Sequence, residues 1–256
     1  MKKNCLLAIS SLIIAVGCFW QSLTFADPTA FDAAKVKEIQ KIVHSYLVQN
    51  PQILREMAQS LRSQEMVKMQ EETKAEIGKH LKELLNTQKH LAIGNLNGDI
   101  IMVEIFDYQC SHCKTVNSTI ENLIKKDPNL QVTFLEWPIF GADSTYAAKA
   151  ALASNLQGKY LAMHDALLDA DNPLTKAKVL EVAKSVGLDQ KKLAHDINDH
   201  AIDALVKDNI KLGQSLKLIA TPAFIFINRS NNKFDFALGA VDETELRNVI
   251  NKLRTK

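Results

Sequence analysis

The sequence predicts an α/β fold, in which a sheet is interrupted by a block of helices and preceded by an all-helical N-terminal region. Short apolar runs with strand character lie at 100–106, 130–135, 223–227 and 233–238. Between about 144 and 216, Ala- and Leu-rich segments with helical spacing replace such runs. Residues 27–88 are rich in Gln, Glu, Lys, Leu and Met and also lack a strand-like run.

The composition of the 256 residues limits the class of protein. With 46% hydrophobic residues, the chain can bury the core of one or two domains without disulfide staples. There are 31 Lys and Arg against 29 Asp and Glu, and Lys2 and Lys3 account for the excess. A chain without a net positive field is not expected to bind nucleic acid.

The first 26 residues have the features of a secretory signal peptide. Lys2 and Lys3 precede the apolar run Cys5–Trp20, and small residues stand before a cleavage site after Ala26. The run of about 16 residues is shorter than the roughly 20 that a membrane-spanning helix needs. The alternative is lipoprotein processing, because residues 15–18 resemble a lipobox in which Cys18 would carry the lipid. Both alternatives predict an exported protein, either soluble or tethered by lipid.

Residues 27–90 are predicted to form amphipathic helices. Ile39, Ile42 and Tyr46 repeat at helical spacing, and Pro51 fits a helix stop and restart. A sparser apolar stripe follows on a heavily charged helix: Met66, Met69, Ile77, Leu81, Leu84 and Leu85. Such a stripe must be covered, either by the chain's own second domain or by a second copy of the helix. We favour self-association, which predicts a homodimer through residues 27–90.

Residues 91–256 are predicted to form the second domain. A turn-rich joint at Gly94–Gly98 precedes the first strand, and a helix is expected over 114–126 before the second strand. The helical insertion at about 144–216 separates these elements from the last two strands. A closing helix runs from Asp242, a plausible N-cap, to Leu253.

The most informative motif is Cys110-Ser111-His112-Cys113, which follows a predicted strand and begins a predicted helix. With Cys5 and Cys18 in the leader, only this pair of cysteines remains after export. The first turn of a helix presents unpaired N–H groups and the positive end of the helix dipole, which stabilise a thiolate. Protonated His112 would add a cation. Cys110 is therefore the expected nucleophile, and Cys113, one turn further, the resolving thiol.

Metal binding is the competing interpretation of this spacing. A structural zinc ion needs four ligands, yet no other cysteine survives export and three histidines of the insertion, His164, His195 and His200, form no paired cluster. We therefore expect no structural metal and no cofactor. Binding of a soft ion such as Cu(I) by the reduced dithiol is chemically reasonable and stays open.

Two further features favour redox chemistry. Glu104 interrupts an apolar strand six residues before Cys110. It either faces water at a strand edge or is a buried carboxyl that moves protons to and from the cysteine pair. Thr221-Pro222 stands directly before the strand at 223–227. Proline is tolerated at the start of a strand, but a cis peptide bond here would instead offer main-chain groups of Thr221 to a substrate.

Residues 90–254 resemble the DsbA-like disulfide oxidoreductases of the thioredoxin fold. The resemblance includes Glu104 at the acid position, the Cys110/Cys113 pair, the helical insertion, and Thr221-Pro222 at the position of the cis-proline. Residues 106–113 and 137–141 are also similar to the Com-type outer-membrane antigens, whose N-terminal helical extension serves dimerisation. Ser111 stands where the best-known members have Pro, which leaves the redox potential open.

The resemblance implies a periplasmic thiol-disulfide oxidoreductase that forms or isomerises disulfides through Cys110 and Cys113. It implies that Thr221 and Pro222 bind substrate, that exported unfolded or misoxidised proteins are the substrates, and that a membrane oxidase or reductase resets the pair. The alternative is a surface or lipid-anchored protein without enzymatic activity, in which the fold is only a scaffold.

Overall fold

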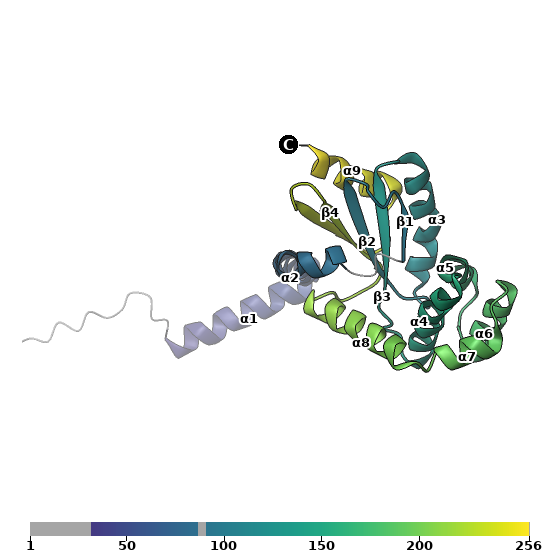
Figure 1. Ribbon diagram of the computed structural model, residues 1–256. Coiled ribbons are helices and arrows are strands. Elements are labelled where there is room, and N and C mark those ends of the chain that lie inside the picture. The colour runs from purple at the N-terminus through teal and green to yellow at the C-terminus, as the bar shows by residue number, and fades with distance from the viewer. Residues whose placement is uncertain (1–31, 87–90, 256) are drawn as a thin grey trace, which may run out of the picture. The chain divides into compact units, whose positions relative to one another are not determined.

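The computed structural model describes residues 32–86 and 91–255 (Figure 1). The expected signal peptide and Cys18 lie outside these residues. Within them, no helix combines the length and apolar character needed to cross a membrane. The chain divides into two compact units, the first ending at Ser60 and the second beginning at Leu61.

The first unit is helical. It contains α1 (Ala33–Gln49) and the start of α2 (Gln52–Asn86), a helix of 35 residues that continues into the second unit. Asp32 caps α1 by accepting a hydrogen bond from the Lys35 N–H at 2.8 Å. No side chain of α1 is buried, and a row of apolar side chains repeats at spacings of three and four: Val36, Ile39, Val43 and Tyr46.

The second unit is built on a five-stranded sheet in the order β1-β3-β2-β4-β5. Its strands are β1 (Ala92–Gly94), β2 (Ile100–Phe106), β3 (Leu130–Glu136), β4 (Ala223–Asn228) and β5 (Phe234–Leu238). β2 and β3 are parallel, and the other neighbours are antiparallel. Every residue of the central strands β2 and β4 is buried, as their continuous apolar runs predict. The four predicted strands are confirmed, whereas β1, which ends at Gly94 where the expected turn-rich joint begins, was not predicted.

Helices cover both faces of this sheet. The first face carries α3 (Ser111–Lys126), α9 (Glu243–Arg254) and most of the helical insertion. The insertion contains α4 (Ala142–Ser154), α5 (Tyr160–Asp169), α6 (Lys176–Ser185), α7 (Gln190–Asp196) and α8 (His200–Ser215), close to the expected span. The Asp242 side chain caps α9 by accepting a hydrogen bond from the Glu245 N–H at 2.8 Å, as predicted.

The second face is covered by the C-terminal half of α2 and the end of α8. Ile77 and Leu84 of α2 are buried there in one cluster with residues of β2 and β4, and Thr73 of the same helix is also buried. This part of the apolar stripe, which we expected to meet a second copy, instead packs on its own domain. The compact unit therefore begins at Leu61 and not at the expected residue 91, because α2 fills a face of the sheet that would otherwise stay open.

Candidate active site

Cys110 occupies the N-cap of α3, at the end of a short loop that leaves β2. Its N–H donates to the Asp107 carbonyl at 3.0 Å, and its own carbonyl accepts from the Lys114 N–H at 3.2 Å. Both Cys110 and Cys113 are free thiols in this structure. Cys110 is 4% exposed, whereas Cys113, inside the first turn of α3, is fully buried.

The two thiols have opposite pKa shifts. A hydrogen bond from the Cys113 thiol is the largest cause that lowers the pKa of Cys110, to about 5. The backbone N–H groups of Cys113 and His112 at the helix N-terminus act in the same direction, against the effect of burial. The expected contribution of His112 thus comes through its main chain. Burial, above all, raises the pKa of Cys113 far above its ordinary value. Cys110 is the nucleophile that this arrangement favours.

Thr221 and Pro222 lie beside the nucleophile, and the peptide bond between them is cis. The Cys110 Sγ is 3.3 Å from the Thr221 carbonyl oxygen, to which the thiol donates. The buried Thr221 hydroxyl has no hydrogen-bond partner within the described chain, and the Thr221 side chain is among the causes that lower the pKa of Cys110. The loop before β4 therefore places the main chain and the side chain of Thr221 beside the Cys110 sulfur.

Glu104 is buried in the middle of β2, with 1% of its surface exposed. It pairs with Phe134 of β3 and Phe224 of β4, and neither carboxylate oxygen has a hydrogen-bond partner in the part of the chain described. Burial raises the pKa of Glu104 to about 8, and the negative charge of Cys110 adds to the rise. Glu104 therefore holds a proton at neutral pH, close to the cysteine pair, and does not face water at a strand edge.

Asp107, which the sequence did not single out, organises the loop before Cys110. Its Oδ1 accepts from the Gln109 N–H at 2.8 Å, and its Oδ2 accepts from the N–H groups of Ile139 at 2.7 Å and Phe140 at 3.1 Å. The segment after β3 is thereby fixed to the loop that carries the nucleophile. A single acid in a loop gives no sequence signal for such a role.

Lys114 fixes the other side of the motif. Its ammonium group donates to the carbonyls of Leu167 at 3.0 Å, Leu168 at 3.2 Å and Ala170, at the end of α5. Burial lowers the pKa of Lys114, while nearby carboxylates oppose that effect. The first turn of α3 is therefore attached to the helical insertion.

A buried polar cluster lies beneath the insertion on the same face. The Tyr160 hydroxyl donates to Glu136, and burial raises the pKa of this carboxyl to about 7. The Tyr108 hydroxyl lies 3.1 Å from Nδ1 of His164, and burial lowers the pKa of His164 to about 3. His164 is thus a neutral core residue. Across residues 32–86 and 91–255, no three or more His, Cys, Asp or Glu side chains are arranged to hold a metal ion.

Comparison with known sequences gives two family matches. The DsbA-like thioredoxin domain matches residues 101–251, and the N-terminal domain of the copper resistance protein ScsC matches residues 36–66. A probable disulfide bond formation protein D of Bacillus anthracis is 23% identical over 166 residues, 59% of this chain and 76% of that protein. Several mycobacterial Na⁺/H⁺ antiporters are 26% identical over 145 residues, and the chain spans only about a quarter of their length.

Several solved structures have a fold similar to that of this chain, and some of them are also similar in sequence. A thioredoxin-like oxidoreductase of Silicibacter pomeroyi is 33% identical, with a TM-score of 0.62 over 67% of this chain and 95% of that one. The thiol-disulfide exchange protein α-DsbA2 of Wolbachia pipientis is 29% identical, with a TM-score of 0.63 over 71% and 95%. BcfH of Salmonella enterica Typhimurium is 25% identical, with a TM-score of 0.66 over 87% and 97%. With more than half of its residues matched and the redox pair in place, the chain belongs to the DsbA-like thioredoxin family of thiol-disulfide oxidoreductases.

Proposed function

We propose that the protein is a periplasmic thiol-disulfide oxidoreductase that forms and isomerises disulfides in exported proteins. The observation that carries this proposal is the asymmetry of the cysteine pair. Cys110 has a pKa of about 5 and lies 3.3 Å from the Thr221 carbonyl, while Cys113 is buried and has a raised pKa. A stabilised Cys110 thiolate is a good leaving group, which favours oxidation of substrates by the Cys110–Cys113 disulfide.

In the oxidising direction, a substrate thiolate attacks Cys110 Sγ and breaks its bond to Cys113. Cys113 leaves and takes up a proton, and Glu104, which is protonated at neutral pH, is the buried group able to supply it. A second substrate thiolate then attacks the substrate sulfur, forming the new disulfide and releasing the Cys110 thiolate. The substrate loses two electrons, which the cysteine pair gains and passes to a membrane redox partner.

In the isomerising direction, the reduced Cys110 thiolate attacks an incorrect substrate disulfide, and a different substrate thiol later displaces it. A dimer with two such sites would hold a misoxidised protein between them. The exposed apolar row on α1 supports self-association through the helical region, for which a dimer is the smallest assembly. The same proposal includes export directed by the first 26 residues. These residues are either cleaved off or processed so that Cys18 carries a lipid, and the intact mass of the exported protein distinguishes cleavage from lipid attachment.

Redox titration tests the proposal. The Cys110–Cys113 pair is equilibrated with glutathione buffers, and a potential nearer the roughly −120 mV of strong oxidants than the roughly −270 mV of thioredoxin is expected. Refolding of scrambled ribonuclease measures isomerisation, with Cys110→Ser as the inactive control. Absence of any reversible titration, or equal recovery of ribonuclease activity with Cys110→Ser, would refute the function.

Light scattering tests self-association. Val43→Glu places a charge within the apolar row of α1 and is expected to lower the mass to that of a single chain. Val48→Glu makes the same change at a similarly exposed valine on the opposite side of the helix. Equal masses for the two variants would contradict an interface along this row.

Binding of Cu(I) is a second candidate function, favoured by the match of residues 36–66 to the N-terminal domain of a copper resistance protein. The two free thiols of Cys110 and Cys113 share a hydrogen bond and are the soft donors that this ion prefers. Competition with a coloured Cu(I) chelator is expected to show one ion per reduced chain and weaker binding by Cys113→Ser. Equal affinities would exclude the dithiol as the site.

A further inference from the structure

The segment at residues 167–174 contains the end of α5 and the loop that leads to α6, and we call it the clamp segment. It is hydrogen-bonded to Gln109, directly before Cys110, and to Lys114, directly after Cys113. These bonds join parts of the chain that are 53 to 65 residues apart in sequence. The helical insertion therefore holds the redox motif at both ends, although it contributes neither cysteine.

The peptide group between Gln109 and Cys110 is hydrogen-bonded on both of its edges. Its carbonyl oxygen, on Gln109, accepts from the Asn172 side chain at 2.8 Å, and its N–H, on Cys110, donates to the Asp107 carbonyl at 3.0 Å. A planar peptide group that is held on both edges cannot rotate without breaking one of these bonds. Since such a rotation would change the φ angle of Cys110, the two bonds fix how the nucleophile enters α3.

The side chain of Gln109 makes a further bond to the clamp segment. Its Oε1 accepts from the Leu174 N–H at 3.1 Å. Leu174 is completely buried, with 0% of its surface exposed, so water does not replace this acceptor when it is lost. The Gln109 N–H in turn donates to the Asp107 carboxylate at 2.8 Å. The residue before the nucleophile thus has its main-chain donor, its main-chain acceptor and its side-chain oxygen in fixed contacts.

Lys114 fixes the other end of the motif. An ammonium group has three N–H donors, and Lys114 contacts three carbonyls, those of Leu167, Leu168 and Ala170. These carbonyls lie at the C-terminal end of α5, where carbonyls lack partners within the helix and a positive charge is favourable. The first turn of α3 therefore cannot shift relative to α5 without leaving the end of α5 uncapped.

The position of this first turn determines how strongly the Cys110 thiolate is stabilised. The Cys113 thiol and the N–H groups of Cys113 and His112, which lower the pKa of Cys110, all belong to it. Hydrogen bonds weaken steeply when their angles are distorted, so a shift of the turn would weaken all three at once. A more stable thiolate stabilises the reduced pair and makes the disulfide a stronger oxidant. The clamp segment thus has a means of acting on the redox equilibrium from outside the motif.

We propose that Gln109 is a positioning residue for Cys110: bonded to the clamp segment, it holds the nucleophile against the first turn of α3 and makes the Cys110–Cys113 disulfide more oxidising. This inference rests on the proposed function and assigns to the helical insertion a part in setting the redox potential. A purely structural bond would stabilise the oxidised and the reduced protein equally, whereas a positioning bond favours the reduced protein with its thiolate.

The test removes the side-chain oxygen of Gln109 without changing any charge. Gln109→Met keeps the length and the unbranched shape of the side chain but leaves the Leu174 N–H without its acceptor. Because the charged groups around the motif are the same in both chains, a change in the stability of the thiolate reports position and not charge. All chains carry Cys5→Ser and Cys18→Ser, so that the redox pair contains their only cysteines.

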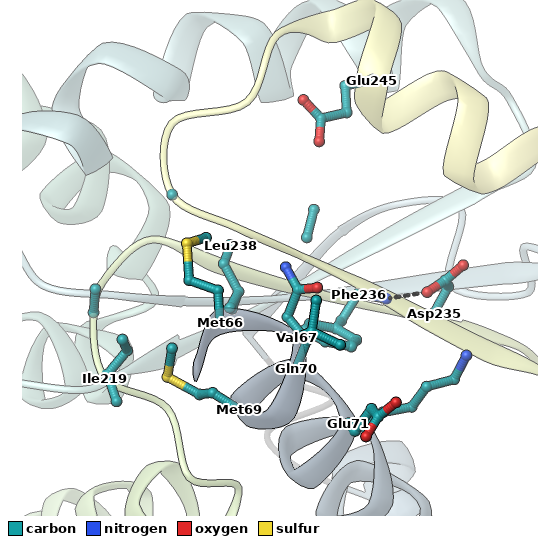
Figure 2. Close-up of a pocket in the computed structure, with 14 residues that line it drawn as sticks. Met66, Val67, Met69, Gln70, Glu71, Ile219, Asp235, Phe236, Leu238 and Glu245 are labelled. Atoms are coloured by element: carbon teal, nitrogen blue, oxygen red, sulfur yellow. Dashed lines mark hydrogen bonds between the residues drawn. The ribbon is translucent and has the colours of Figure 1, made fainter. Parts of the chain in front are cut away.

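Two matched controls make the same exchange elsewhere. Gln157 is also half-buried, and its Oε1 accepts from the Asp189 N–H at 2.9 Å while its Nε2 donates to the Asp189 carbonyl at 3.3 Å. Gln157→Met therefore removes the same kind of contact within the insertion and should lower the free energy of urea unfolding to a similar extent. Gln70→Met makes the exchange on α2, where Gln70 lines a groove beside β5 (Figure 2) and lies outside the clamp segment.

Two quantities are measured for each chain: the pH midpoint of Cys110 alkylation by iodoacetamide, followed by mass spectrometry, and the equilibrium constant with glutathione. For Gln109→Met, the thiolate is expected to be about fivefold less stable, which is what one ordinary hydrogen bond can supply. The alkylation midpoint then rises by about 0.7 pH units, and the fivefold change in the equilibrium constant makes the potential about 20 mV more negative. Both controls should match the original chain in both measurements.

Asn172→Ala is a second variant, which frees the carbonyl edge of the same peptide group at an exposed position. It should shift both quantities in the same direction and decides the point if Gln109→Met does not fold. Unchanged values, with only the free energy of unfolding lowered, would make the contact merely structural and overturn the inference. A shift of equal size in Gln157→Met would trace the effect to general destabilisation and would overturn it as well. If the original chain shows no reversible titration, the proposed function itself fails.

Discussion

Replacing Glu104 by Gln tests the assignment of this residue as a buried, protonated carboxyl. In the unfolded chain a glutamate ionises above its ordinary pKa of 4.5, whereas in the folded chain Glu104 stays protonated up to about 8. The folded state therefore loses stability from this group as the pH rises through that window. The loss is about 1.4 kcal/mol per pH unit, or about 3 kcal/mol between pH 5 and pH 7.5.

Gln has nearly the shape of Glu and does not titrate. The free energy of unfolding of Glu104→Gln, relative to that of the original chain, is therefore expected to rise by about 3 kcal/mol between pH 5 and pH 7.5. The measurement is urea unfolding of the reduced protein at several pH values, followed by the fluorescence of the buried Trp137. The difference between the two chains isolates Glu104, because the other titrating groups are common to both.

A matched control is Glu65→Gln, which removes a carboxyl from the exposed face of α2 and should change stability by less than about 0.5 kcal/mol at every pH. In the oxidised protein the negative charge of the Cys110 thiolate, which helps to raise the pKa of Glu104, is absent. The pH-dependent rise in the unfolding free energy of Glu104→Gln should therefore be smaller in that protein. A stability difference that stays flat from pH 5 to pH 7.5 would show that Glu104 remains ionised in the folded chain and would refute the reasoning.

Three further predictions follow from single contacts. Alkylation of Cys110 by iodoacetamide, followed by mass spectrometry, should show a midpoint near pH 5, and a midpoint near 9 would contradict the thiolate assignment. Tyr160→Phe removes the hydroxyl that donates to the buried Glu136 carboxyl and should destabilise the fold by about 2 kcal/mol in the same urea unfolding. Tyr146 is only half-buried, so Tyr146→Phe should have little effect. Gly213→Ala would bring a Cβ atom into overlap with the indole ring of Trp137 and should cost about 1–3 kcal/mol of unfolding free energy. Gly78→Ala, whose Cβ atom would lie 3.4 Å from the ring of Phe234, should be neutral or stabilising.

The sequence was informative wherever a local pattern decides the structure. The runs of β2, β3 and β4 are apolar because these strands are buried, and Asp242 caps α9 as its position predicts. The short strand β1 was not predicted from the sequence, because three residues are too few to show an alternation of apolar and polar side chains. The apolar stripe of α2 was identified correctly, but a stripe does not reveal what covers it, and its second half turned out to belong to the core.

The active site was predictable where its residues are close in sequence or belong to the family pattern. Cys110, Cys113, Glu104 and Thr221 meet around one point, although only the structure shows that Glu104 is buried and that the bond after Thr221 is cis. Contacts such as Asp107 with Ile139, 32 residues apart, have no signature at any fixed spacing. The Com-type subgroup and the dimer stay predictions.

The position of β2 has a consequence for how the molecule opens. β2 lies between β3 and β4 and is buried along its whole length, so its amide hydrogens should exchange with solvent only when the entire second unit unfolds. Ile219 and Ala220, which directly precede Thr221, are exposed and should exchange their amide hydrogens early. The reactive sulfur of Cys110 thus lies between a rigid segment, β2, and a more flexible one, the loop that contains Ile219 and Ala220. The first holds Glu104 and the start of the loop that leads to Cys110 in fixed positions, while the second can change its conformation.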